Sequence, residues 1–339
     1  TGKATITNMG AELGATTSIF PYDDRMRDYL TGTRRSGLAD LAGENLDLLQ
    51  ADPEVLADPE AHFDRVVTID LSTLEPHLVG PHSPDVAHPV GRMAEDCERE
   101  GYPVELSAAL VGSCTNSSYE DISRAADVAQ QALDAGVEMK APLLVSPGSD
   151  QIYETIKRDG QLAVLEKLGA TVLTNACGPC IGQWKRDDYQ EGDVNSIVTS
   201  FNRNFRKRND GNAETHAFIG SPEVVMAYGL AGRLDFNPLS DTLTGKDGRE
   251  VRLAAPEPAA DLPAEGFVFS RLPQGRYRLV CDAQAWDTPA PEVDVVAPLT
   301  RLDVRIDVPA TFGLRVVVRD RFGRLVPTML LGEEDTERL

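Results

Sequence analysis

Between about residue 106 and residue 234, short apolar runs alternate with longer segments of helical periodicity. This alternation is typical of βαβ units, in which each crossover helix returns the chain to a parallel sheet. It predicts an α/β fold with a parallel sheet. The predicted strands and the loops that follow them are LSAALVGSC (106–114), APLLVSPGS (141–149), TVLTNACGPC (171–180), SIVTSFNRNF (196–205) and THAFIGS (215–221).

The segments between these runs carry helix start signals. Ser117 and Glu120 have the spacing of a capping box ahead of a helix that ends near Gly136. Asp150 can cap the next helix, and Ser221 precedes Pro222 as an N-cap precedes the first helical residue. Each predicted strand is therefore followed by a predicted helix or a loop.

Changes in pattern along the chain predict four regions. Residues 1–72 form part of an α/β domain with a strand at 65–71, and residues 73–255 form an α/β domain that carries the cysteines. The proline-containing segment EPHLVGPHSPDVAHPV is expected to be an extended linker or loop between them. Residues 256–265 form a linker, and residues 266–339, with short alternating strands, form a small β-sandwich-like segment.

Charge and composition exclude several classes of protein. The formal net charge is −21, so the surface repels phosphates, and the basic run FNRNFRKRND is weak support for nucleic-acid binding. No run of about 20 apolar residues predicts a membrane span, and the N-terminal residues do not resemble a secretory signal. Five cysteines in 339 residues argue against a disulfide framework. We expect a cytoplasmic protein, or one of the mitochondrial matrix in a eukaryote.

Cys114, Cys177 and Cys180 all directly follow predicted strands. The carboxyl ends of parallel strands meet at one edge of a sheet, where three thiolates can converge. Three cysteines without a fourth protein ligand would leave one iron of a 4Fe-4S cluster open to substrate, as a Lewis acid. The residues alone leave open a zinc site, a thiol redox pair, or inert structural thiols. Cys97 and Cys281 are expected to be ordinary thiols.

Polar residues near the same edge suit an anionic ligand. Arg203 and Arg208 follow a predicted strand, and two guanidinium groups can each bind a carboxylate through paired hydrogen bonds. A solvated basic loop is the simpler interpretation. Asn8 and Glu12 lie four residues apart, on one face if their segment is helical. They could hydrogen-bond a hydroxyl or a bound water, or pair at the surface. The histidines are expected to be structural or exposed.

Several long motifs resemble the aconitase family in the same order over about residues 1–262. They are NMGAELGATTSIFP, GPHSPDVAHPV, GSCTNSSYEDISRAA, PGSDQIYETI, NACGPCIGQW, SFNRNFRKRNDGNAETHAFIGSPE and NPLSDTLTGKDG. The C-terminal segment of about 70 residues instead resembles carboxypeptidase-regulatory-like β-sandwiches.

The aconitase resemblance implies a hydro-lyase that isomerises citrate to isocitrate through cis-aconitate, with a 4Fe-4S cluster. It implies that Cys114, Cys177 and Cys180 hold the cluster, that Asn202 lies beside it, and that Arg203 and Arg208 bind substrate carboxylates. Asn8 and Glu12 would face the substrate and water. It also implies an incomplete chain, since no first domain or swivelling domain with its serine base is visible. The alternative is a non-catalytic zinc or iron-sulfur module with a β interaction domain.

Overall fold

The computed structural model describes residues 1–173, 178–268, 275–281, 292–295 and 316–320. The chain divides into two compact units, one made of residues 1–21 and 51–268 and the other of residues 22–50 and 269–339. Every predicted site residue belongs to the first unit by its position in the chain. The four-region division predicted from sequence stays a prediction.

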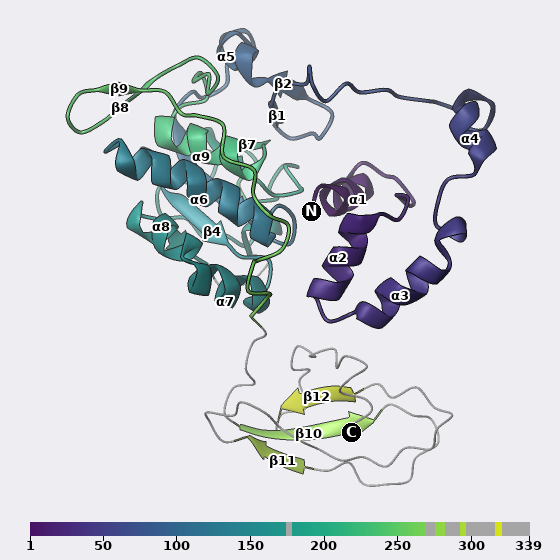
Figure 1. Ribbon diagram of the computed structural model, residues 1–339. Coiled ribbons are helices and arrows are strands. Elements are labelled where there is room, and N and C mark those ends of the chain that lie inside the picture. The colour runs from purple at the N-terminus through teal and green to yellow at the C-terminus, as the bar shows by residue number, and fades with distance from the viewer. Residues whose placement is uncertain (174–177, 269–274, 282–291, 296–315, 321–339) are drawn as a thin grey trace. The chain divides into compact units, whose positions relative to one another are not determined.

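Within the described part of the first unit, seven strands form one mixed sheet in the order β2-β1-β7-β6-β3-β4-β5 (Figure 1). The five strands from β7 to β5 are parallel, and β1 is antiparallel to both β2 and β7. The predicted α/β class is confirmed. The strands are β1 (His77–Val79), β2 (Ala87–Pro89), β3 (Leu106–Gly112), β4 (Leu143–Ser146), β5 (Thr171–Val172), β6 (Asn195–Thr199) and β7 (Thr215–Ile219).

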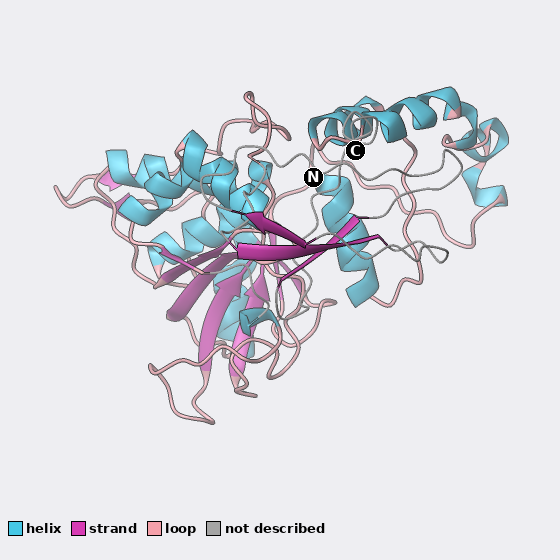
Figure 2. Cartoon of the chain, turned by 90° about the horizontal axis from the view of Figure 1, so that it is seen from below, coloured by secondary structure: helices cyan, strands magenta, loops and turns pink. Residues whose placement is uncertain are grey.

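One face of this sheet is covered by helices (Figure 1 and Figure 2). Helix α6 packs against α8 and α9, and α9 contacts β3. Alternate residues of β3 divide between the two faces, because Ala109 and Val111 join the helix-covered core whereas Ala108 and Leu110 join a separate cluster. The helices of this unit are α1 (Gly2–Glu12), α4 (Pro53–Ala57), α5 (Met93–Glu100), α6 (Tyr119–Asp134), α7 (Asp150–Asp159), α8 (Gln161–Lys167) and α9 (Pro222–Ala231).

The opposite face carries a small apolar cluster whose members come from strands and loops. Trp184 and Leu144 pack against it from the side. The 3-10 turn η4 (Gly178–Cys180) contributes a cysteine to it. Loops therefore cover the strands on this face, whereas helices cover them on the other face. The buried members are Ala108, Leu110, Cys180, Ile197, Phe201 and Ala217.

The strand prediction at 65–71 and the linker prediction at 75–90 are both wrong. Residues 65–71, predicted as a strand, form none, and their apolar side chains are exposed, with Leu71 at 78%. The segment 75–90, predicted as a linker, instead forms the β1–β2 hairpin. Leu78 of this hairpin is fully buried in the core. The prolines of the segment favoured a linker in the sequence, and the core contact of Leu78 was not expected.

Two predicted helix caps are wrong by one residue. The capping box of α6 consists of Ser118 and Asp121, where Ser117 and Glu120 were expected. The N-cap of α7 is Ser149, whose hydroxyl accepts from the amide of Ile152, and Asp150 is the first helical residue. Ser221 does precede Pro222 at the start of α9, without a side-chain capping bond.

The remaining elements are short. The first unit also contains the two-stranded β8 (Leu243–Thr244) and β9 (Glu250–Val251). The second unit contains α2 (Asp24–Gly32) and α3 (Ser36–Glu44). It also contains a separate antiparallel sheet in the order β11-β10-β12, made of β10 (Gly275–Cys281), β11 (Glu292–Val295) and β12 (Val316–Asp320). The sandwich resemblance there stays a prediction. No helix in the described residues is long and apolar enough to cross a bilayer.

Candidate functional site

The loops after β3 and β6 leave the sheet at its topological switch point. From β3 the chain proceeds to β4 and β5 on one side, and β6 and β7 lie on the other side of β3. Loops that diverge from neighbouring parallel strands open a crevice, and ligands bind there in open α/β sheets. Cys114 follows β3, and Asn202 and Arg203 follow β6. The fold thus brings these predicted site residues to one edge.

The turn that carries Cys114 has an unusual backbone. Gly112 has a φ of +112°, and a Cβ there would lie 1.9 Å from the carbonyl oxygen of Ser146, so only glycine fits. Ser113 and Asn116 also have positive φ, at 89° and 54°. Such conformations are costly and persist where surrounding bonds enforce them. The Asn116 side-chain amide donates to the carbonyl of Ser200 at 2.8 Å. The thiol of Cys114, which lies between Ser113 and Asn116 in the sequence, is exposed.

Helix α1 contributes Asn8 to this edge. The Asn8 side-chain oxygen accepts from the Thr115 hydroxyl at 2.6 Å and from the Asn202 amide at 2.7 Å. One turn earlier, the Thr5 hydroxyl donates to Asn116 Oδ1 at 3.1 Å. The segment is helical, so Asn8 and Glu12 lie on one face, which is the condition the sequence left open. Three separate segments of the chain therefore meet around the Asn8 side chain.

Glu12, one turn further along α1, is paired with Arg203. The Nε of Arg203 donates to Glu12 Oε1 at 2.7 Å. This hydrogen bond is the main cause that raises the pKa of Arg203 above its ordinary value, and the charges of Glu12, Cys180 and Cys114 add to it. Cys114 and Cys180 lie in loops 66 residues apart in the sequence, and the charges of both favour the protonated form of one guanidinium.

Cys180 is buried beside the second loop. Its thiol donates to Asn202 Oδ1 at 3.5 Å, so Asn202 connects Cys180 to Asn8. Cys177 lies outside the described residues, and among those described no three histidine, cysteine or carboxylate side chains are grouped for a metal ion. Cys114 is exposed and Cys180 is buried, and thiolates are the ligands that iron-sulfur clusters take.

The second predicted arginine has an unsatisfied side chain. The Nε of Arg208 is buried and has no hydrogen-bond partner among the described residues. Its neighbours Arg206 and Lys207 are exposed. Buried donors are almost always paired, so an unpaired one in a loop at the site suits a bound acceptor such as a carboxylate.

The turn around Cys180 (residues 178–184, the cysteine turn) and the loop at residues 203–210 (the arginine loop) are held together by hydrogen bonds and a close backbone approach. Asn209 donates from its side-chain amide to the carbonyl of Pro179 at 3.1 Å, and the amide of Trp184 donates to the carbonyl of Asn209 at 3.4 Å. Gly182 has positive φ, and a Cβ there would lie 2.5 Å from the carbonyl oxygen of Lys207. Any shift of one segment would therefore move the other.

Thr115, Asn116 and Ser200 bind the site loops to one another, and sequence reasoning did not single them out. The available signal was their place beside Cys114 and Asn202. Of the histidines, His88 is structural as predicted, because it is buried and bridges Asp96 at 2.7 Å and the carbonyl of Gly80 at 2.8 Å.

Comparison with known proteins shows the family of this chain. The model of the aconitase family (aconitate hydratase) matches residues 1–232. The chain belongs to the aconitase family, as the motifs predicted. It is 54% identical over 267 residues to the probable mitochondrial aconitate hydratase of Dictyostelium discoideum, covering 79% of this chain and 34% of that protein. The mitochondrial enzymes of Gracilaria gracilis and Schizosaccharomyces pombe are 54% and 52% identical, with 79% of this chain and 33% of each covered. The chain spans about a third of the length of these relatives.

Proposed function

We propose that this chain is the cluster-bearing part of an aconitate hydratase, which binds a 4Fe-4S cluster through Cys114, Cys177 and Cys180 and a tricarboxylic acid beside it. The carrying observation is the hydrogen-bonded chain from Asn8 through Asn202 to Cys180, which joins the first helix to the cysteine turn. Family membership and the names of the relatives support the same chemistry. Those names also support a mitochondrial location in a eukaryote.

When bound, the cluster supplies one Lewis-acidic iron that can polarise a hydroxyl leaving group. The residues of this chain bind and orient the substrate. The buried Nε of Arg208, which has no partner among the described residues, can donate to one substrate carboxylate. The Nε of Arg203 donates to Glu12, so its two terminal nitrogens can donate to a second carboxylate. The Asn8 oxygen fixes the Asn202 amide and the Thr115 hydroxyl next to the cysteines. Removal of the carbon-bound proton also needs a positioned base.

Anaerobic reconstitution tests the cluster assignment. The wild-type chain should take up about four iron and four sulfide and give the absorbance and electron paramagnetic resonance spectra of a 4Fe-4S centre. Cys114→Ser, Cys177→Ser and Cys180→Ser should each lose that signal. Cys97→Ala is the matched control, since burial raises the pKa of the Cys97 thiol to about 11 and keeps it protonated inside the core.

Metal analysis separates this proposal from the non-catalytic alternative. A colourless chain that binds about one zinc and no sulfide would favour a zinc module. Retention of the cluster signal by all three serine variants would refute the ligand assignment. Addition of citrate should alter the resonance spectrum of the reduced cluster, and an unaltered spectrum would refute the tricarboxylate site.

A further inference from the structure

Arg186 lies six residues after Cys180, and its side chain is almost fully enclosed by the protein. Its side chain is 2% exposed, and that of Asp210, its ion-pair partner, is fully buried. The Nη1 of Arg186 donates to Asp210 Oδ2 and to Asn195 Oδ1, each at 2.9 Å. Its Nε and Nη2 donate to the two carboxylate oxygens of Asp188 at 3.0 and 2.6 Å.

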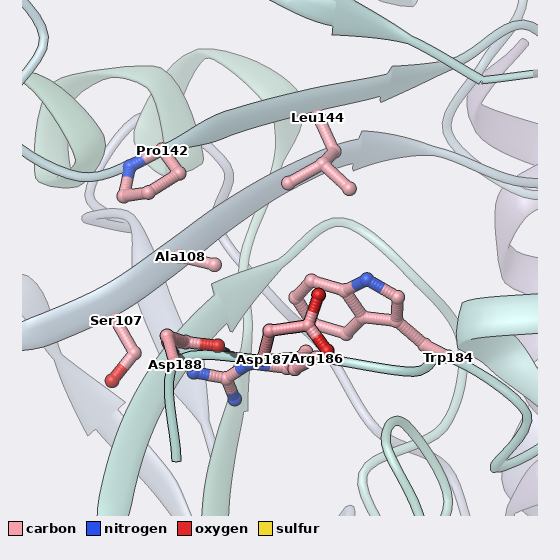
Figure 3. Close-up of a pocket in the computed structure, with 8 residues that line it drawn as sticks. All are labelled: Ser107, Ala108, Pro142, Leu144, Trp184, Arg186, Asp187 and Asp188. Carbon is pink, nitrogen blue, oxygen red and sulfur yellow. Dashed lines mark hydrogen bonds and ion pairs between the residues drawn. The ribbon is translucent and has the colours of Figure 1, made fainter.

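Aromatic rings complete this enclosure. The guanidinium carbon lies 5.0 Å from the ring centre of Trp184 and 4.8 Å from that of Tyr189, both within range of a cation–π interaction. Figure 3 shows Arg186 beside Trp184, below Leu144 of β4, at a cavity of about 410 Å³. Four of the five N–H groups of Arg186 donate to Asp188, Asp210 and Asn195, so the guanidinium is bound mainly within the protein and is a poor donor to a ligand in this cavity.

Burial of an ion pair costs several kcal/mol of desolvation per ion, which the mutual attraction of the charges repays only with good geometry and further hydrogen bonds. Stability alone is therefore a poor reason for this pair. A buried pair with fixed geometry does specify where its two backbone segments lie.

Asp210 fixes the end of the arginine loop. Its Oδ1 accepts from the amide of Asn212 at 3.0 Å, and its Oδ2 accepts from the Thr215 hydroxyl of β7 at 2.7 Å. Its carbonyl accepts from the Tyr189 hydroxyl at 3.1 Å. Asp210 is two residues after Arg208, so every bond on Asp210 limits the freedom of the Arg208 backbone.

We propose that Arg186 is a positioning residue for the tricarboxylate site, which fixes Arg208 through the buried Arg186–Asp210 pair. Arg186 touches neither substrate nor cluster. The assignment rests on the proposed function, because it presupposes that Arg208 binds a carboxylate. Its consequence is that affinity for citrate depends on a side chain that pairs with Asp210, two residues after Arg208.

The test compares Arg186→Gln, Arg186→Lys and Arg233→Gln in the full chain after cluster reconstitution. Arg233 is the matched control, since it forms the same pair with a carboxylate two residues later, Asp235, but at an exposed position away from the site. Three properties are measured: iron and sulfide content, the dissociation constant of citrate, and the citrate-induced change in the resonance spectrum of the reduced cluster.

We expect R186Q to retain wild-type iron and sulfide and to bind citrate about 10-fold to 100-fold more weakly, because small misplacements of binding groups have effects of this size. R186K, which keeps the charge but not the planar fork, should fall between R186Q and wild type. R233Q should equal wild type in all three measurements.

Unchanged citrate affinity in folded R186Q overturns the assignment, and if R186Q does not fold, unchanged affinity in R186K overturns it. Loss of the cluster from R186Q also overturns it, because Arg186 would then hold the Cys180 turn and not the arginine loop. A wild-type chain that takes up the cluster but does not bind citrate refutes the proposed tricarboxylate site itself, and the assignment falls with it.

Discussion

The two faces of the parallel sheet are stabilised in different ways. The helix-covered face is a continuous apolar core in which Ile122, Leu165, Val225 and Phe218 are fully buried. On the other face the apolar cluster is small, and the buried residues of the neighbouring loops are mostly polar. The polar set includes Ser200, Asn202, Asn204, Asn209, Asp210 and Asn212.

This difference separates stability from the placement of functional groups. Apolar contacts are non-directional, so a core tolerates small shifts of its members. Hydrogen bonds and ion pairs depend on angle and distance, so a loop held by them has a defined conformation. Mutations on the helix-covered face should therefore reduce stability, and mutations in the loops should reduce ligand binding.

The largest expected effect is on stability. Phe218→Ala removes a fully buried ring of β7 that packs edge-on against Tyr102 with ring centres 5.2 Å apart. It should lower the free energy of unfolding by about 3–5 kcal/mol, measured by urea unfolding. Leu239→Ala, at a position 42% exposed, is the control and should change it by less than about 0.5 kcal/mol. If the Phe218→Ala protein that remains folded binds citrate more weakly than wild type, the division between residues for stability and residues for binding is wrong.

The next effect is on binding. Arg208→Gln should weaken citrate binding by about 1.5–3 kcal/mol, roughly 10-fold to 100-fold, as expected for loss of a charged hydrogen bond. Its stability should stay near wild type, since the Nε of Arg208 has no partner to lose among the described residues. Titration calorimetry measures the affinity. Arg206→Gln, in the same loop but exposed, should bind as wild type does, and equal losses in both variants would indicate a general charge effect.

A smaller effect is expected where the site loop enters α6. Ser118→Ala removes the hydroxyl that accepts from the amide of Asp121 in the capping box, which should cost about 1 kcal/mol. Ser221→Ala at the start of α9 is the control, because that N-cap makes no side-chain capping bond. Thermal unfolding compares the two. A greater loss in Ser221→Ala would show that cap geometry is not the cause.

The smallest effect concerns pH. Burial is the main cause that lowers the pKa of His82 from 6.5 to about 4, and the positive charge of Arg206 contributes to this shift. Between these values the unfolded chain binds more protons than the folded chain, so stability is fully present above about pH 6.5 and falls as the pH drops towards 4.

His82→Phe should remove part of this dependence. Because His82 is partly exposed, we expect the difference in melting temperature between pH 7 and pH 5 to shrink by only about 2–4 °C. His216, whose pKa is also lowered by burial, contributes to the dependence that remains. His62→Phe at an exposed position should leave the difference unchanged, and an equal effect of the two substitutions would rule out burial as the cause.

The sequence predicted the strands of the sheet well, since β3, β4, β6 and β7 begin within two residues of their expected starts. Their apolar runs are buried on both faces, which makes the pattern strong. Residues 65–71 have a similar pattern but find no partner strand, and the 75–90 segment forms a hairpin because β7 offers an edge to Val79. A local pattern holds no information about available partners.

By itself, the sequence determined the α/β class, the positions of the cysteines and arginines after strands, and family membership, because periodicity and motifs are local properties of the chain. Only the tertiary structure decided that Asn8 bonds Asn202, that Glu12 takes the Nε of Arg203, and that Arg186 meets Asp210 in a buried pair. These pairs join segments up to 194 residues apart, and their geometry follows from how the loops pack on the sheet.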